Sequence, residues 1–469
     1  MVLFARLPLR HALIWGLIVG HLFLPENFSF NFSGLPPFDK SMVSVSALLL
    51  AVLIYRNPSH AHRSIKVEEV QPLVDQNRAF GYLVIGLVVL TLFTPILTIL
   101  VNRAPIVIGD RVLSGLRPWD YLSMVSRIVV SIAPYFLARH FLATPNDHRL
   151  LLRVLIMTGI VYSALILLEI RLSPQLHKWV YGYHQASFVQ HFRGGGFRPK
   201  VFLPHGLWVG FFIFTVAIAA FSLARNKDML RRGKYFLAGM WFLVILILSK
   251  NLTASVLGIL LITFIWTKKY WQIQLVTIIT SLFLIYPFLR QYNIIPVEQV
   301  TSLTMRISKD RADSFQFRIR NENILLDRAR QKPVFGWGEW GRSRVYDADG
   351  RDISITDGAW IVVLGTSGWL GYIGFFGLLT APILALRRTT RRKDIPVETL
   401  GLALIMAGNL IYLVPNSTLG PIGWLIAGSL AGFVQFDPAQ SEIRDANEPK
   451  PESRKNRYTR FPHRPRHAR

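Results

Sequence analysis

Basic side chains without acidic neighbours gather in one polar interval, residues 173–205. This interval contains no Asp or Glu, and its candidate anion ligands are Arg193, Arg198, Lys200 and His205. The run Gly194-Gly195-Gly196 allows backbone amides to approach a ligand closely. Guanidinium groups and exposed amides together bind phosphate oxygens well. The interval therefore predicts an anion site, and the alternative is a basic loop that rests on lipid headgroups.

A second polar interval, residues 290–357, is the longest in the chain and contains a predicted helix over 313–332. Apolar residues at helical spacing form a stripe along this helix: Phe315, Ile319, Leu326 and Ala329. Arg318 falls beside the stripe, whereas Arg320 points about 160° away from Arg318. We therefore expect Arg318 to face a ligand and keep Arg320 as the second choice. The alternative is an ion-paired surface helix.

Asp357 ends this interval, directly before a long apolar run. A carboxylate there either caps the following helix or acts as a general base. Four histidines in the first interval invite a metal hypothesis, but their spacing fits no common ligand pattern, and the chain has no cysteine. We therefore expect no metal and no cofactor.

The elements that position these residues are apolar helices. Half of the chain is hydrophobic, and the mean hydropathy is +0.35, a balance that is typical of membrane proteins rather than soluble ones. The net charge of +26 does not indicate nucleic acid, because the basic residues cluster in short loops between apolar runs. About twelve segments meet the length of a membrane span: 11–24, 41–55, 79–101, 119–141, 150–171, 206–224, 235–249, 252–267, 272–289, 358–386, 397–414 and 417–435.

The positive-inside rule then orients the chain. It places both termini in the cytoplasm and the loops 173–205 and 290–357 on the outer face of a single transmembrane domain, residues 1–436. Residues 437–469 form a basic tail that we expect to be disordered. The turn Ser249-Lys250-Asn251 separates two spans, and Asp120, two turns from the intramembrane Arg127, is the expected partner of that charge.

The order of these motifs resembles that of the bacterial O-antigen ligase and polymerase superfamily, in particular its exopolysaccharide-polymerising branch. Family members have an Arg, then a Pro and a Gly-x-Gly turn, which is similar to Arg318, Pro333 and Gly336-Trp337-Gly338. They also have an Arg shortly before a middle span, which is similar to Arg198 ahead of His205-Gly206. The resemblance covers nearly the whole chain.

Two positions depart from the family pattern. Ligases of this family have a His, seven further residues and a Gly at the start of the span after the large loop, where this chain has Asp357 and Gly365. They often have a Ser-Arg pair where this chain has Ser249-Lys250, so the role of Lys250 stays open. The replacement of His by Asp favours a polymerase or an unassigned branch of the family over a ligase.

The resemblance implies an all-α, GT-C-like membrane glycosyltransferase with about twelve spans, independent of metal, in the bacterial inner membrane. Its donor would be an oligosaccharide on undecaprenyl diphosphate, polymerised at the periplasmic face into a surface polysaccharide. Asp357 would accept the proton from the attacking hydroxyl, and the leaving diphosphate would be neutralised by Arg318 and Arg198, with Arg193, Lys200, Arg320 and His205.

Two alternatives remain at this point. One is a ligase that transfers glycan to a lipid acceptor, and the other is a transporter of an anionic solute or glycolipid. The expected partners are the lipid-linked oligosaccharide and membrane lipid, with chain-length regulators or export proteins as further candidates and no nucleic acid.

Overall fold

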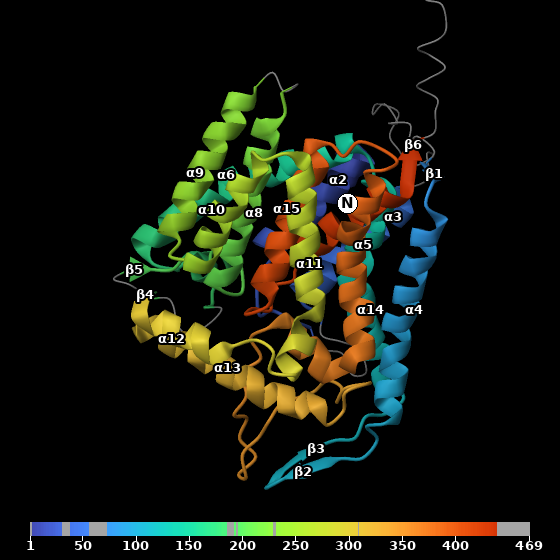
Figure 1. Ribbon diagram of the computed structural model, residues 1–469, viewed down its shortest axis with the longest axis vertical. Helices are drawn as coiled ribbons and strands as arrows, with labels where there is room; N and C mark the ends of the chain where they lie inside the picture. Colours follow the sequence, from blue (N-terminus) through green and yellow to red (C-terminus); the bar gives the residue numbers. More distant parts are fainter. Residues whose placement is uncertain are drawn as a thin grey trace, which may run out of the picture.

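The computed structural model describes residues 2–30, 38–55, 73–184, 192–193, 196–227, 231–307 and 309–438. These residues form a bundle of helices with three short strand pairs (Figure 1). The helices are α1 (Val2–Arg6), α2 (Leu9–Phe23), α3 (Lys40–Tyr55), α4 (Arg78–Leu100), α5 (Asp120–Phe141), α6 (Pro145–Leu172), α7 (Leu176–Tyr181), α8 (Gly206–Arg225), α9 (Arg232–Leu248), α10 (Leu252–Ile265), α11 (Lys269–Gln291), α12 (Val297–Ile307), α13 (Lys309–Arg330), α14 (Ala359–Thr389), α15 (Val397–Leu413) and α16 (Pro421–Gln435).

Each of the twelve segments predicted as a span overlaps one of these helices over most of its length. Six of them are long and apolar enough to cross a membrane: α4, α5, α6, α8, α11 and α14. Five more are apolar but shorter, namely α2, α3, α10, α15 and α16. The chain is therefore a helical membrane protein, and crossing by all twelve segments stays a prediction. The turn predicted at 249–251 is present, with Asn251 as the N-cap of α10.

The strands pair in three antiparallel ribbons. They are β1 (Leu73–Asp75) with β6 (Phe436–Pro438), β2 (Ile106–Ile108) with β3 (Arg111–Leu113), and β4 (Phe192–Arg193) with β5 (Gly196–Phe197). Asp437 and Pro438 belong to β6, so the expectation that the tail begins at 437 is wrong for these two residues. Their backbone groups have a partner in β1, which a solvated tail lacks. Residues 439–469 of the predicted tail lie outside the described residues.

Most of the helices share one large hydrophobic core in which α8, α15 and α16 are central. In the most apolar 18-residue stretch of each helix, 83% of the residues are buried in α8, against 33% in α4 and in α11. A helix that is apolar all round belongs inside the bundle, whereas a helix with exposed apolar residues faces lipid. Figure 1 separates the two ends of the bundle: α12, α13 and the β2–β3 ribbon lie at one end, and the β1–β6 ribbon lies at the other. We call these the α13 end and the β6 end.

Helix α14 is interrupted at Gly368, whose φ of 62° and ψ of −166° lie outside the helical region. The interruption frees backbone groups that the segment 333–338 satisfies through four hydrogen bonds: Trp369 N–H to Pro333 C=O (2.8 Å), Leu370 N–H to Val334 C=O (3.2 Å), Trp337 N–H to Gly365 C=O (2.9 Å) and Gly338 N–H to Thr366 C=O (2.8 Å). An interrupted helix is stable at membrane depth only when such partners are provided. The Gly-x-Gly turn is thus fixed in place against α14.

The same turn is fixed to α5 through Glu339. Arg127 Nη1 lies 3.2 Å from Glu339 Oε2, whereas the Asp120 carboxylate accepts the backbone N–H of Arg117 at 2.7 Å. The predicted pairing of Arg127 with Asp120 is therefore wrong. Seven residues of helix separate the two by about 10 Å along the axis, and the Asp120 carboxylate instead holds the segment just before α5.

The interruption of α14 generates a test of stability. Replacing Gly368 with Ala should lower the free energy of unfolding by at least about 2 kcal/mol, because the backbone is left-handed there and the new Cβ would lie 2.4 Å from the backbone of Val334. Thermal unfolding of the purified protein in detergent measures this effect. Gly365→Ala is the matched control, since its Cβ would meet Ser343 at an ordinary 3.4 Å. Equal melting temperatures for the two variants would contradict the role given to Gly368.

Candidate functional site

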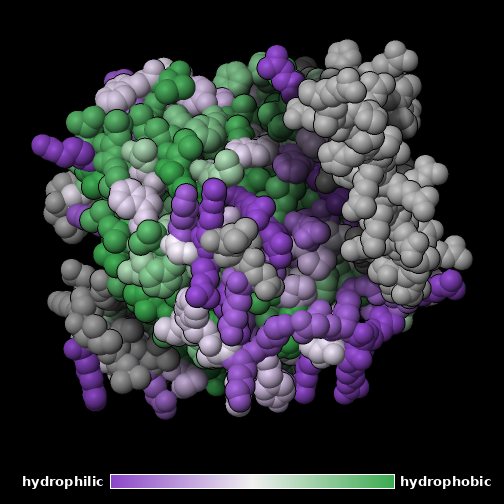
Figure 2. Space-filling view, turned by 90° about the horizontal axis from the view of Figure 1, so that it is seen from above, coloured by the Kyte–Doolittle hydropathy of each residue, from purple (hydrophilic) through white to green (hydrophobic). Residues whose placement is uncertain are grey.

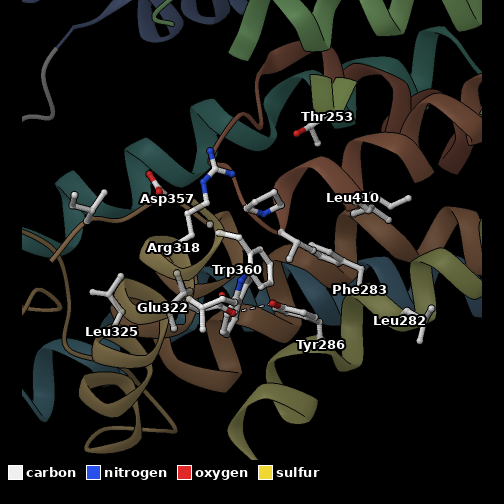
Figure 3. Close-up of a pocket in the computed structure, with 18 of the residues that line it drawn as sticks. Thr253, Leu282, Phe283, Tyr286, Arg318, Glu322, Leu325, Asp357, Trp360 and Leu410 are labelled. Carbon is white, nitrogen blue, oxygen red and sulfur yellow. Dashed lines mark hydrogen bonds between the residues drawn. The ribbon is translucent and has the colours of Figure 1, made fainter. Parts of the chain in front are cut away.

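A cavity of about 550 Å³ lies at the α13 end of the bundle, where the second polar interval meets the helices (Figure 3). Its wall combines a cation and two carboxylates with a broad apolar surface. The lining residues come from α10 (Thr253), α11 (Ile279, Leu282, Phe283, Tyr286), α13 (Phe315, Arg318, Ile319, Glu322, Leu325), the chain before α14 (Ile355, Asp357, Gly358), α14 (Trp360, Ile361) and α15 with its C-terminal extension (Leu410, Ile411, Val414, Pro415). One polar corner facing an apolar wall is the arrangement expected of a ligand site.

Arg318 and Asp357 are the two predicted residues that the structure brings together in this cavity. Figure 3 shows their side chains beside one another at one side of it. Neither makes a hydrogen bond or ion pair with another described residue, and both side chains are partly exposed. Arg320 is exposed and is not part of the cavity wall. As predicted from their angular separation on the helix, Arg318 faces the cavity and Arg320 faces away from it.

Asp357 does not cap the following helix. The N-cap of α14 is Gly358, and no side chain donates or accepts a capping hydrogen bond there. A capping carboxylate would be occupied by backbone amides of the first turn. The Asp357 carboxylate is instead directed to the cavity, which is the position that a general base needs.

Glu322, the second carboxylate of the cavity, is engaged by α11. Its Oε1 accepts hydrogen bonds from the Tyr286 hydroxyl at 2.9 Å and from Arg290 Nε at 3.1 Å. Arg290, which is 2% exposed, also donates to Asn323 Oδ1 at 2.7 Å. Burial raises the pKa of Glu322, and the charge of Arg290 acts in the opposite direction. This cluster joins α13 to α11. It therefore fixes the position of Arg318, one helical turn before Glu322, in the cavity wall.

Sequence reasoning missed the roles of Glu322, Tyr286 and Arg290 as a unit. One signal was available, because Glu322 lies one helical turn after Arg318 and therefore on the same face. No signal marked Arg290 as its partner, since Arg290 is separated from it by 32 residues. Only the fold brings the end of α11 to the middle of α13.

The two polar intervals approach each other through Tyr412 of α15. The Tyr412 hydroxyl interacts electrostatically with both Arg198 and Arg318. It accepts a hydrogen bond from Asn251 Nδ2 at 2.9 Å and donates to the Leu207 carbonyl at 3.1 Å. Arg198 is 4% exposed and packs on Gly206 at the start of α8. Two of the predicted diphosphate ligands, Arg198 and Arg318, are thus both near enough to one buried phenol for their charges to act on it.

The turn 249–251 belongs to the same region. The Lys250 ammonium lies against Gly196 of the glycine run, so close that a Cβ on that glycine would be 2.5 Å from Nζ. Lys250 itself has a left-handed φ of 54°. Lys250 therefore adds a cation next to the first polar interval, at the position where the family pattern has Arg.

Lys200 stands apart from this group because it is buried beside carboxylates from outside its own loop. Glu169 of α6 accepts the backbone N–H groups of Lys200, Val201 and Leu176 at 2.8, 2.7 and 3.2 Å. Burial lowers the pKa of Lys200 to about 8, while the charges of Glu169 and Glu26 act to raise it. The first interval is therefore not the uncompensated basic loop that its own sequence indicates. Lys200 in particular is balanced by acidic groups of the protein itself.

His205 and Arg193 complete the predicted set. His205 is the N-cap of α8, and its Nδ1 accepts the Leu207 N–H at 3.2 Å, which leaves the ring proton on Nε2. Arg193 lies in β4 opposite Gly196 of β5. Its backbone is described but its side chain is not, and Gly194 and Gly195 lie outside the described residues. The structure thus gives His205 a capping role and leaves the direction of the Arg193 side chain a prediction.

The described residues contain no group of three or more His, Cys, Asp or Glu side chains arranged to hold a metal ion. What the cavity offers is one cation, one carboxylate without a partner and an apolar wall. A carboxylate and a guanidinium in one partly enclosed pocket can accept a proton and neutralise an anionic leaving group.

The Glu322 cluster generates a prediction about stability. Replacing Arg290 with Met should lower the free energy of unfolding by about 3–5 kcal/mol, because it leaves a buried carboxylate without its cation. The double variant Arg290→Met/Glu322→Gln should lose less than the single variant, since no buried charge then remains. Thermal unfolding of all four combinations in detergent measures the coupling. Additive losses would contradict the pairing.

Lys200 generates a prediction about pH. Its pKa is about 8 in the folded protein against an ordinary 10.5, so between these values the folded state binds fewer protons than the unfolded state. Stability then rises with pH across that window. The melting temperature of the wild type, measured relative to that of Lys200→Met, should rise as the pH is raised from about 8 to about 10.5. A difference between the two proteins that does not change with pH would contradict the buried, perturbed lysine.

No protein-family model matches this chain, and no curated protein matches it. The functional assignment therefore depends on the chemistry of the cavity and on the resemblance carried by its motifs.

Proposed function

We propose that this protein is a membrane glycosyltransferase that polymerises oligosaccharide repeats carried on undecaprenyl diphosphate into a surface polysaccharide. The observation that carries the proposal is the cavity in which Arg318 and Asp357, each without a partner among the described residues, adjoin an apolar wall. A lipid-linked sugar diphosphate has the matching parts: an anionic leaving group, a polar sugar and a long apolar chain.

Arg318 is assigned to the leaving group. As the bond between the anomeric carbon and the diphosphate oxygen breaks, negative charge grows on that oxygen, and a guanidinium placed beforehand stabilises it. Arg198, which acts on the same phenol as Arg318, is the second candidate cation. The buried position of Arg198 agrees with a guanidinium that is held in one orientation. Lys250 beside Gly196 is a further cation within this region.

Asp357 is assigned to the acceptor. A sugar hydroxyl attacks the anomeric carbon, a new glycosidic bond forms, and the hydroxyl proton passes to the Asp357 carboxylate. Glu322 is the less suitable base, because its oxygen already accepts hydrogen bonds from Tyr286 and Arg290. Asp357 has no such competitor among the described residues. Each turnover exchanges one glycosidic bond to diphosphate for one between sugars and needs no further reactant.

The apolar wall is assigned to the lipid end of the substrate. Leu282 and Phe283 of α11 and Leu410 and Ile411 of α15 line the cavity, and Leu282 and Ile411 are also exposed on the bundle surface. An isoprenoid chain could enter from the bilayer between these helices while its diphosphate meets Arg318. In the predicted orientation this end of the bundle faces the periplasm, where completed repeats are joined.

The proposal is tested by glycan profiles in cells that lack this gene and carry a plasmid copy of it. Cells with the wild type should make long surface polysaccharide, whereas cells with Arg318→Ala or Asp357→Asn should accumulate a single lipid-linked repeat. With purified protein, loss of the general base should reduce the rate by about 10²–10⁴, and loss of the cation should reduce it by about 10²–10³.

Arg320→Ala is the matched control, because it removes the same side chain from the same helix on the exposed side, and it should retain polymer. Membrane levels of all variants are compared on immunoblots. Accumulation of full-length lipid-linked polymer in the null strain would indicate a ligase instead of a polymerase. A glycan profile that the gene deletion does not change would contradict glycosyl transfer altogether.

A further inference from the structure

We infer that the opposite end of the bundle carries a site for an anionic phospholipid, formed where α14 ends beside the start of α4. Three arginines near the C-terminus of α14, Arg387, Arg388 and Arg391, surround a cavity of about 350 Å³. All three side chains are exposed, and none has a hydrogen bond or ion pair with a described residue. The cavity is thus lined by three guanidinium groups that no described residue compensates.

The neighbouring cations of this segment are compensated, which sets the three arginines apart. Lys393 pairs with Asp437 and Lys269 with Asp394, and Arg392 donates to the Gln76 carbonyl. Cations at the end of a helix are favoured by its dipole, which by itself explains one or two of them. The dipole does not explain why three guanidinium groups converge on one cavity while the nearby acids are committed elsewhere.

A second cavity, of about 380 Å³, adjoins the first through Arg388 and has a different character. It is a groove between α4 and α14, and apart from Arg388 and Asn77 its lining is apolar: Ala79, Phe80, Leu83, Ala381, Leu384 and Ala385. Leu83 is 50% exposed, so the groove opens on the lipid-facing side of the bundle. The small side chains of Ala381 and Ala385 give it its depth.

These two cavities together have the polarity of a phospholipid. A phosphate group suits the three guanidiniums, and the first carbons of an acyl chain suit the alanine-lined groove. Figure 2 views this end of the bundle and shows hydrophilic side chains across its centre and lower edge, with apolar side chains mainly in its upper left part. A free phosphate would use only the arginines, so the groove is the observation that favours a lipid.

Binding to the purified full-length protein in detergent tests the inference. Native mass spectrometry measures the affinity of phosphatidylglycerol, with phosphatidylcholine as the zwitterionic comparison and glycerol 3-phosphate as the headgroup without chains. Phosphatidylglycerol should bind at one saturable site, at least about tenfold more tightly than phosphatidylcholine. The variant Arg387→Gln/Arg388→Gln/Arg391→Gln should lose about tenfold in affinity.

The matched control is Arg231→Gln/Arg232→Gln/Lys234→Gln, which removes the same charge from exposed positions at the start of α9, and it should lose less than about twofold. Ala385→Phe fills the groove without changing charge and should weaken phosphatidylglycerol while leaving glycerol 3-phosphate unchanged. If the triple variant fails to purify as a monodisperse species, Arg388→Gln replaces it, because Arg388 lines both cavities.

Two results would overturn the inference. An equal loss in the control variant would mean that a diffuse basic surface attracts the lipid. Full phosphatidylglycerol affinity in Ala385→Phe, together with equally tight binding of glycerol 3-phosphate, would mean that the arginines bind a soluble anion and that no acyl chain occupies the groove.

Discussion

The hydrogen bonds that join the segment 333–338 to the interruption of α14 are the constraint on which the candidate site depends. Breaking a helix inside a membrane exposes amides and carbonyls to a medium that cannot hydrogen-bond them. Here the turn after α13 supplies one partner each for Gly365, Thr366, Trp369 and Leu370. These hydrogen bonds fix the C-terminal end of α13 against α14, the helix that begins just after Asp357. Arg318 and Asp357 therefore belong to one rigid framework, although they lie 39 positions apart in the sequence.

The distribution of charge partners divides the polar groups into two classes. Glu322 is bonded to Arg290, Lys200 lies beside Glu169 and Glu26, and Glu339 is paired with Arg127. Burying such groups is tolerable only because each has its counterpart. Arg318 and Asp357 face one cavity and are not satisfied in this way among the described residues. This difference in pairing is why the proposed function gives Arg318 and Asp357, and not the paired groups, to the ligand.

The sequence predicted the elements better than their relations. Apolar runs located the twelve helical segments, and the period of 313–332 separated Arg318 from Arg320, because both depend on local composition and helical geometry. Contacts between distant segments left no such trace. Arg290 with Glu322 and Arg127 with Glu339 join residues far apart in the chain, and the compensation of Lys200 comes from α6 and from the loop after α2. The glycines of α14 indicated close packing, but only the structure distinguishes Gly368, where the helix is interrupted, from Gly365, where it is not.

The β1–β6 ribbon has a consequence for biogenesis. Its strands pair Leu73–Asp75 with Phe436–Pro438, and Gln435 links Asp75 to Arg139 of α5. A chain made on the ribosome emerges from its N-terminus, so β1 exists long before β6 is synthesised. The start of α4 and the end of α5 therefore lack the contacts of this ribbon until α16 has been inserted. The ribbon therefore closes only after α16 has been made, and from then on it joins the start of α4 to the end of α5.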